Sequence, residues 1–387
     1  MLRLPDGLDT AAFLKLYWQR RPLLMRNALQ IPGALFANEL AFLACDEEVE
    51  SRIVMEQGVS GRWQVLHGPF TDDDFARLPD SHWTLLVQDV DKWLPEVART
   101  LDDFRFLPDW RVDDIMVSYA ADHGSVGPHT DDYDVFLIQA SGRRRWQITS
   151  EPVADADLLP DLDLRILKHF EPDEDWVLEP GDVLYLPPKI AHWGTGLGEC
   201  MTWSVGFRAP SAGEIAAAWI EQRLATASDD RYRDPAPGSI TRPGEIPPQT
   251  IDATRRMCAR LLDPETEDFT RWMTGFLSEP KEHLSPLPAE TPLSMPELAR
   301  RLRAGASLRR APGARILCYR QGEAIYLAAS GIVHDLDTGL ADLATLLADM
   351  RYVQAERLAP WLDDPRALDL LVKLHNEGQL ELENGNG

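Results

Sequence analysis

Two histidines and one carboxylate in this chain have the residue types and the spacing of a metal site. His129 and Asp131 lie two residues apart, and in an extended segment residues i and i+2 point to the same side. His192 follows in the motif Pro-Pro-Lys-Ile-Ala-His-Trp-Gly. Two imidazoles and one carboxylate on one side of a metal leave its other positions open for substrate and dioxygen, as in non-haem Fe(II) oxygenases. We therefore predict these three residues as iron ligands. The alternatives are a surface turn, a satisfied core histidine, or zinc or manganese in the same ligand set.

An arginine is expected to be buried close to this site. Residues 135–138 are typical of a buried strand, and residues 143–148 return as its partner after a glycine-containing turn. In the second strand Arg144 alternates onto the same face as Trp146 and Ile148. A guanidinium among apolar side chains is costly unless it meets an anion. That anion would be a protein carboxylate or a dicarboxylate co-substrate. A solvated basic patch is the alternative, and it suits the two neighbouring arginines better than Arg144.

The segments around His192 predict further short strands. Residues 178–188 have the pattern of a turn, a strand and a proline stop, which places His192 just beyond a strand. Residues 201–207 alternate as another strand soon afterwards. Such an order of elements describes a small antiparallel barrel with the metal at its mouth.

Taken together, these motifs resemble the JmjC branch of the 2-oxoglutarate oxygenases, whose core is a double-stranded β-helix. They resemble most the bacterial ribosomal oxygenases of that branch, whose best-known activity is hydroxylation of an arginine in large-subunit ribosomal protein sixteen. The resemblance implies Fe(II) as cofactor, with 2-oxoglutarate and dioxygen as co-substrates. It rests on the segments 129–131, 133–139, 142–146, 180–188, 192–194 and 204–208, and on an opening helix near 13–24.

The same resemblance implies roles for six further side chains. Arg144 would anchor the distal carboxylate of 2-oxoglutarate, and Met116 and Ser118 would line its pocket. Three residues are expected to contact a substrate guanidinium: Asp114 through charge, Tyr133 through its aromatic face and Ser204 through a hydrogen bond. A solvated turn is the alternative for Asp114. The loop before His129 departs from the family by carrying Asp122-His123, for which a substrate contact is the remaining option.

The order of segments predicts an α+β protein with three domains. Residues 1–209 would form the double-stranded β-helix (JmjC/cupin-like) oxygenase domain. A capping-box pattern then opens a helical segment at 210–285, whose one-sided apolar helices suggest a dimerisation domain and hence a homodimer. Residues 286–387 resemble a winged helix. Because they carry 14 Asp/Glu against 11 Lys/Arg, a docking or scaffold role is favoured over direct nucleic-acid binding.

Composition narrows the class of partner. The net charge of −24 would repel nucleic acid and attract a basic protein, which agrees with a basic ribosomal protein as substrate, although acidity also serves solubility. The chain has no apolar run of membrane-spanning length and no secretory signal pattern. Its four cysteines are widely spaced, which favours reduced thiols and a cytoplasmic location.

Other functions fit parts of the pattern. Within the same enzyme branch, the target would be a histidine or an asparagine, or the reaction would be a demethylation. Outside it, the chain would be a non-catalytic docking protein with a vestigial core. Asp114 and Tyr133 favour arginine as the target, and the intact ligand set argues against a vestigial core.

Overall fold

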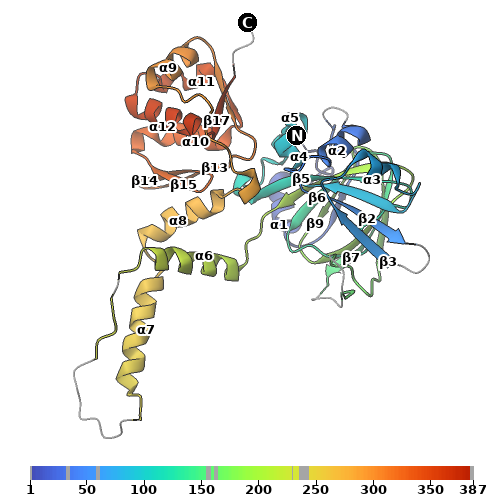
Figure 1. The fold of residues 1–387 in the computed structure, drawn as a ribbon, viewed down its shortest axis with the longest axis horizontal. Coiled ribbons are helices and arrows are strands. Elements are labelled where there is room, and N and C mark those ends of the chain that lie inside the picture. Colours follow the sequence, from blue (N-terminus) through green and yellow to red (C-terminus); the bar gives the residue numbers. More distant parts are fainter. Residues whose placement is uncertain are drawn as a thin grey trace. The chain divides into compact units, whose positions relative to one another are not determined.

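The computed structural model describes residues 2–31, 35–57, 62–153, 158–160, 164–228, 230–234 and 244–383. The chain divides into two compact units (Figure 1). Unit 1 comprises residues 1–209 together with Lys281–Pro286 and Ala311–Gly313, and unit 2 comprises the remaining segments. A short piece of chain that follows the helical segment in sequence thus belongs to unit 1.

The larger sheet of unit 1 is antiparallel throughout and has eight strands in the order β1-β9-β6-β11-β5-β4-β2-β3. Neighbours in this sheet are mostly distant in sequence, so its order brings together segments from the whole unit. The strands are β1 Leu23–Met25, β2 Ser51–Gln57, β3 Arg62–His67, β4 Trp83–Val87, β5 Val112–Ala120, β6 Asp134–Ser141, β9 Val183–Leu186 and β11 Cys200–Phe207.

A second sheet faces the first and has the order β10-β7-β8. Val135 and Leu137 of β6 pack in one apolar cluster with Trp146 and Ile148 of the second sheet, and this cluster fills the space between the sheets. The strands of this sheet are β7 Arg144–Pro152, β8 Glu174–Leu178 and β10 Ile190–Gly196. Two facing antiparallel sheets with a side-chain-filled interior are the architecture of a double-stranded β-helix.

Helices cover the outer face of the large sheet. The alternate residues of β6, Phe136 and Ile138, point to this outer side and pack with Phe13 of α1 and Leu40 of α2. Burying one such side chain contributes about 1.5–3 kcal/mol to the stability of the fold. One face of β6 thus packs against the helices and the other against the second sheet. The helical elements here are α1 Thr10–Leu16, α2 Ala37–Leu43, α3 Asp72–Ala76, α4 Val90–Trp93, α5 Pro95–Ala98, η2 Arg99–Phe104, η3 Asp109–Arg111 and η4 Glu282–Leu284.

Unit 2 begins with three helices: α6 Ala212–Ala225, α7 Pro248–Leu262 and α8 Glu267–Ser278. The capping box predicted for α6 is present, because Ser211 Oγ accepts from Glu214 N–H and the Glu214 carboxylate accepts from Ser211 N–H. Trp219 of α6 packs against Phe269 and Trp272 of α8 with ring centroids about 5 Å apart.

The remainder of unit 2 has its own core of leucines and alanines from helices and short antiparallel strands. Its strands form two three-stranded sheets, β16-β12-β17 and β13-β14-β15. The hairpin predicted near residues 316–327 turns at Gly322, as expected. The elements are α9 Met295–Arg303, β12 Ser307–Arg310, β13 Ile316–Gln321, β14 Ala324–Ala329, β15 Ile332–Asp335, η5 Thr338–Leu340, α10 Ala341–Asp349, β16 Tyr352–Val353, α11 Ala355–Leu358, η6 Ala359–Trp361, α12 Pro365–Asn376 and β17 Leu380–Glu383.

Among the residues that the structure describes, none of the helices has the length and apolarity needed to cross a bilayer. The four cysteines are all free thiols.

Candidate active site

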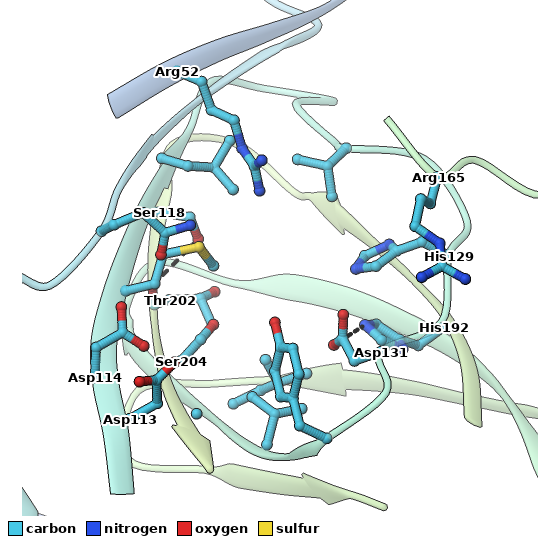
Figure 2. Close-up of a pocket in the computed structure, with 18 of the residues that line it drawn as sticks. Arg52, Asp113, Asp114, Ser118, His129, Asp131, Arg165, His192, Thr202 and Ser204 are labelled. Carbon is cyan, nitrogen blue, oxygen red and sulfur yellow. Dashed lines mark hydrogen bonds and ion pairs between the residues drawn. The ribbon is translucent and has the colours of Figure 1, made fainter. Parts of the chain in front are cut away.

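The three predicted metal ligands come together in unit 1. One ligand atom from each of His129, Asp131 and His192 can be chosen so that all lie within 4.8 Å of one another. The imidazole centroids of the two histidines are 4.2 Å apart, and His192 Nε2 lies 3.6 Å from Asp131 Oδ2. Figure 2 shows the three side chains converging on one side of a pocket. Among the described residues, this is the one group of three or more histidine, cysteine or carboxylate side chains whose ligand atoms lie close enough together to hold a metal ion.

Backbone hydrogen bonds orient both imidazoles. His129 Nδ1 lies 3.0 Å from the carbonyl of Gly127, and His192 Nδ1 lies 3.0 Å from the carbonyl of Ile190. Because a carbonyl only accepts, each Nδ1 carries the proton and each Nε2 presents a lone pair, the state that a metal ligand needs. Burial, and next the neighbouring His129, lower the pKa of His192 to about 4, which keeps this imidazole neutral.

The sequence-based account of how these residues converge was wrong in detail. The strand begins at Asp134, after both His129 and Asp131. His192 follows the strand β9 as predicted, but it lies inside a further strand, β10, that was not predicted. Convergence comes from a two-way backbone bridge, because His129 and His192 each donate an N–H to the other's carbonyl, at 3.0 and 2.9 Å. An isolated bridge between distant segments has no local pattern in the sequence.

Asp134 fixes the point at which the ligand-bearing segment ends and β6 begins. Its carboxylate is fully buried and accepts from Arg111 Nη2 at 2.8 Å and from the hydroxyl of Tyr185 at 2.6 Å. A buried charge held by two such donors resists displacement. The segment that carries Asp131 is therefore anchored three residues away from its ligand.

Arg144 is a buried cation that lines the same pocket. Its side chain alternates with Trp146 and Ile148 as predicted, and all three are buried. Nη1 donates to Ser118 Oγ at 3.4 Å, Nη2 donates to the Gly194 carbonyl at 3.2 Å, and Nε has no hydrogen-bond partner. Burial lowers the pKa of this guanidinium. No carboxylate in the described part of the chain pairs with it, so the pocket holds a charge that needs an anion.

The opposite end of the pocket is acidic. Asp114, Met116 and Ser118 share one face of β5 and all line the pocket, which has a volume of about 510 Å³. Ser204 of β11 lies directly across from Met116 in the antiparallel register. Figure 2 shows Asp113 and Asp114 on the side of the pocket opposite the two histidines. The pocket thus has a metal-site geometry, a cationic wall and an acidic wall.

Electrostatics around Asp114 are unusual. Burial raises the pKa of its carboxyl to about 7, the nearby Lys281 ammonium opposes this rise, and the carboxylates of Asp89, Asp113 and Asp91 add to it. Tyr133 lines the pocket as well, and the charge of Asp131 is the largest cause that raises the pKa of its phenol, followed by burial. Tyr133 therefore remains a neutral aromatic ring beside the acidic wall.

Several pocket residues were not found from the sequence. Thr202 lies opposite Ser118 and shares a face with Ser204, so the two-residue alternation of β11 gave a usable signal for it. Arg52 lines the pocket from β2, and Figure 2 shows it with Arg165 at the rim. Lys281 lies 150 residues beyond Asp131 in a proline-spaced segment with no motif. Nothing local in the sequence pointed to it.

His123 itself does not line this pocket, although Val126 of the same loop does. His123 stacks on His82 with ring centroids 5.2 Å apart and lies 3.5 Å from the Asp122 carboxylate. In the structure, His123 therefore contacts His82 and Asp122 and does not contact the predicted metal ligands.

Comparison with known proteins places this site in a family. The JmjC domain family matches residues 99–215, and the ROXA-like winged helix family matches residues 259–381. The chain is 37% identical over 368 residues to ribosomal protein uL16 3-hydroxylase of Escherichia coli, covering 95% of each chain. The X-ray structure of E. coli ycfD superposes with a TM-score of 0.88 at 36% identity, covering 99% of this chain and 100% of that one. A structure of YcfD from E. coli in complex with cobalt and 2-oxoglutarate gives a TM-score of 0.85 at 36% identity, with the same coverage.

The fold and the pocket therefore define a JmjC-domain oxygenase with a C-terminal winged helix. More narrowly, the chain belongs to the ribosomal oxygenase family that includes the E. coli uL16 3-hydroxylase. The predicted fold class and the predicted enzyme class, a 2-oxoglutarate-dependent oxygenase, are confirmed.

Proposed function

We propose that this protein is an Fe(II)- and 2-oxoglutarate-dependent hydroxylase that acts on an arginine side chain of a large-subunit ribosomal protein. One observation carries the proposal: a single pocket holds the His129, Asp131 and His192 group, a buried guanidinium that no carboxylate of residues with described positions neutralises, and a buried carboxylate wall. Each part matches one of the three partners that the reaction needs. The E. coli relative, named for hydroxylation of ribosomal protein uL16, supports a ribosomal protein as substrate.

The ligand set fits a divalent transition metal. Two neutral imidazoles and one carboxylate leave about half of an octahedral coordination sphere open, which suits iron and a bidentate co-substrate. His129, Asp131 and His192 would hold the metal. Bound Fe(II) would supply the oxidising chemistry by which dioxygen and 2-oxoglutarate convert a C–H bond into a hydroxyl group, with succinate and carbon dioxide as the other products.

Arg144 would hold the distal carboxylate of 2-oxoglutarate. Its unpaired Nε and its two weakly engaged Nη groups form a fork in a dry environment, where a carboxylate is bound strongly. Ser118 Oγ accepts from the guanidinium and donates to the Thr202 carbonyl at 3.2 Å, so it would hold Arg144 in place, while Met116 lines the wall next to it. The guanidinium stacks over the Trp146 ring at 5.1 Å, which fixes its plane before the co-substrate arrives.

The acidic wall would receive the cationic substrate. Asp114 would pair with the substrate guanidinium, Ser204 would hydrogen-bond to it, and the ring of Tyr133, a residue that is 43% exposed, would cover its face. A histidine or an asparagine offers no permanent positive charge to this wall, so the wall favours arginine as the target. The chain's net charge of −24 would attract a basic protein.

The remaining parts of the proposal concern the whole protein. We retain the three-domain division at residues 209 and 285, a homodimer formed through the helical segment, and the absence of direct nucleic-acid binding. A cytoplasmic location agrees with the four free thiols and with a ribosomal substrate.

Peptide mapping of ribosomal proteins tests the substrate assignment. Ribosomal protein uL16 from cells that lack the gene should lack one oxygen atom on one arginine, and complementation with the wild-type gene should restore it. Complementation with His192→Ala should not. Restoration on a histidine or an asparagine would replace the arginine assignment, and an unchanged set of ribosomal proteins would remove the substrate class altogether.

A further inference from the structure

Lys281 occupies an unexpected place at the acidic wall. The segment Lys281–Pro286 follows α8 in sequence but belongs to unit 1, and Lys281 lines the pocket. Its Nζ lies 3.0 Å from both carboxylate oxygens of Asp89, 3.7 Å from Asp114 and 3.9 Å from Asp113. One ammonium group therefore faces three carboxylates.

Asp89 connects this ammonium group to Asp114. Asp89 is 2% exposed, and its backbone N–H donates to Asp114 Oδ2 at 3.0 Å. The residue has a left-handed backbone (φ 54°), which turns its N–H toward Asp114. Lys281 makes its shortest contacts with Asp89, and both Lys281 and the Asp89 N–H approach Asp114 at Oδ2, which leaves Oδ1 as its other carboxylate oxygen.

The Oδ1 side of Asp114 faces a glycine. A Cβ placed on Gly206 would lie 3.3 Å from Asp114 Oδ1 and 3.9 Å from the Tyr133 ring. The absence of a side chain at Gly206 therefore keeps one carboxylate oxygen accessible beside the aromatic ring. This is the oxygen that a substrate cation would meet.

The charges around Asp114 do not balance without Lys281. Asp89 and Asp91 approach from α4 and the residue before it, Asp113 is adjacent on β5, Tyr133 faces from the segment before β6, and His283 Nε2 lies 4.0 Å from Asp89. Lys92 pairs with Asp91. Lys281 Nζ lies 3.0–3.9 Å from carboxylate oxygens of Asp89, Asp113 and Asp114, and Lys92 also lowers the pKa of Asp89. Burial disfavours its charged form, yet the carboxylates of Asp114, Asp113 and Asp89 outweigh burial and raise its pKa.

We propose that Lys281 is a positioning residue that favours the ionised form of the buried Asp89–Asp114 pair, and so makes the acidic wall better able to bind a cationic side chain. The inference rests on the proposed function for the identity of the substrate. On this proposal Lys281, which lies outside the barrel strands, affects the affinity for the substrate and does not affect the binding of the metal or of 2-oxoglutarate.

The first test measures the protonation of Asp114 without any substrate. Carbon-13 carboxyl NMR titrations would compare wild type with Lys281→Met, and Asp114→Asn would identify the signal. Removing the ammonium group should raise the titration midpoint of Asp114 by about one pH unit or more, because a nearby cation favours the carboxylate. Lys281→Arg should leave the midpoint close to the wild-type value. Lys15→Met, the same substitution on the exposed face of α1, should have no effect.

A double variant separates electrostatics from folding. Lys281→Met leaves buried carboxylates without their cation and is expected to lower the unfolding temperature. Asp89→Asn/Lys281→Met removes one negative charge together with the positive one, so both the Asp114 midpoint and the unfolding temperature should return toward wild type. An unchanged midpoint in Lys281→Met, or a double variant no closer to wild type than the single one, would overturn the proposal.

The second test measures turnover of a uL16-derived arginine peptide at several pH values. Lys281→Met should raise KM about tenfold near pH 7 with kcat little changed, and the difference should shrink as pH rises and Asp114 ionises in both proteins. Affinity for 2-oxoglutarate should not change. A uniform loss of kcat at all pH values would contradict a positioning role. A shifted Asp114 midpoint with no turnover by wild type would support the role of Lys281 and remove the arginine substrate.

Discussion

At the scale of single residues, the pocket is built from groups that weaken the fold in the absence of a ligand. Arg144 is a buried cation to which the described residues offer no carboxylate partner, and Asp114 is a buried carboxylate whose pKa is raised to about 7. Buried charges that lack full pairing are destabilising, and we infer that both persist here because each would bind a ligand of opposite charge. We therefore expect that removing the charge of either residue weakens ligand binding and, in the absence of ligand, stabilises the folded protein.

Arg144→Met should weaken the binding of 2-oxoglutarate without destabilising the ligand-free protein. Loss of one partner of a buried charge pair costs about 3–5 kcal/mol of binding, so affinity for 2-oxoglutarate should fall by about two to four orders of magnitude. Without 2-oxoglutarate, the unfolding temperature of the variant should equal or exceed that of wild type. Differential scanning fluorimetry with and without 2-oxoglutarate measures both effects, since a ligand that binds only the folded state raises the transition. A variant that is still stabilised by 2-oxoglutarate would rule out Arg144 as its anchor.

Asp114→Asn should also stabilise the folded protein, by an amount that depends on pH. The folded pKa of about 7 lies above the ordinary aspartate pKa of 3.8, so the folded state binds a proton more tightly than the unfolded state. Stability from this group is therefore present at low pH and is lost as pH rises through about 7, by roughly 4 kcal/mol at most. The variant should be more stable than wild type at pH 8 and lose this advantage near pH 4, measured by urea unfolding at both pH values. A constant difference across that range would contradict the assignment.

At the scale of elements, the strands determine how closely the pocket groups approach one another. Gly194 of β10 pairs with Trp146 of β7, and a Cβ at Gly194 would lie 2.6 Å from Arg144 Nε and 2.7 Å from the Trp146 ring. The close approach of these strands therefore requires glycine. It also holds the guanidinium against the aromatic ring.

Gly194→Ala should displace Arg144 without removing it. Because a misplacement of about 1 Å can cost roughly a hundredfold in a preorganised site, affinity for 2-oxoglutarate should fall by one to two orders of magnitude. Gly213→Ala in α6 is a matched control, since its Cβ would meet only Ser211 Oγ at 3.7 Å. Calorimetric titration with 2-oxoglutarate measures both variants. Equal affinities in the two variants would show that the approach of β10 to β7 does not position Arg144.

The elements also show what the sequence could and could not predict. The alternation in residues 143–148 placed Arg144 on a buried face correctly, and the capping box located the start of α6. Both are local patterns. The bridge between His129 and His192 and the contact of Lys281 with Asp89 join segments 63 and 192 residues apart, for which local spacing carries no information. The resemblance of the whole motif set, and not the spacing alone, brought the ligands together in the prediction.

At the scale of the whole molecule, two features bear on binding to partners: the net charge of the chain and an exposed apolar face of α6. Ile220 and Leu224 of α6 are four residues apart on one helix face and are 40% and 60% exposed in a single chain. A second copy of the chain that covered them would bury this face. The homodimer proposed for the helical segment provides such a cover.

The variant Ile220→Glu/Leu224→Glu should therefore be a monomer under conditions in which wild type is a dimer. Charged side chains at these positions would remove apolar burial and add repulsion across a symmetric contact. Light scattering after size-exclusion chromatography measures the molar mass. Glu221→Gln, a change between the two positions on the exposed surface, is the control. A wild-type monomer at all concentrations would contradict the proposal of a homodimer.

The net charge of −24 should contribute to capture of a basic substrate. Added salt screens charges beyond about 10 Å, so KM for a basic uL16 peptide should rise several-fold between low and high ionic strength, with kcat unchanged. A peptide whose basic residues outside the target arginine are replaced by glutamine should lose most of this dependence. Equal salt dependence for both peptides would mean that the overall charge plays no part in recognition.

The most direct test of the account is the reaction with purified components. Wild-type protein, Fe(II), 2-oxoglutarate, dioxygen and uL16 from the same organism should give uL16 heavier by one oxygen atom on a single arginine, with succinate formed alongside. Mass spectrometry of the intact protein and its peptides measures the product. The account predicts this gain for wild type and none for His192→Ala or Arg144→Met. An equal gain with either variant, or none with wild type that binds the metal and 2-oxoglutarate, would contradict it.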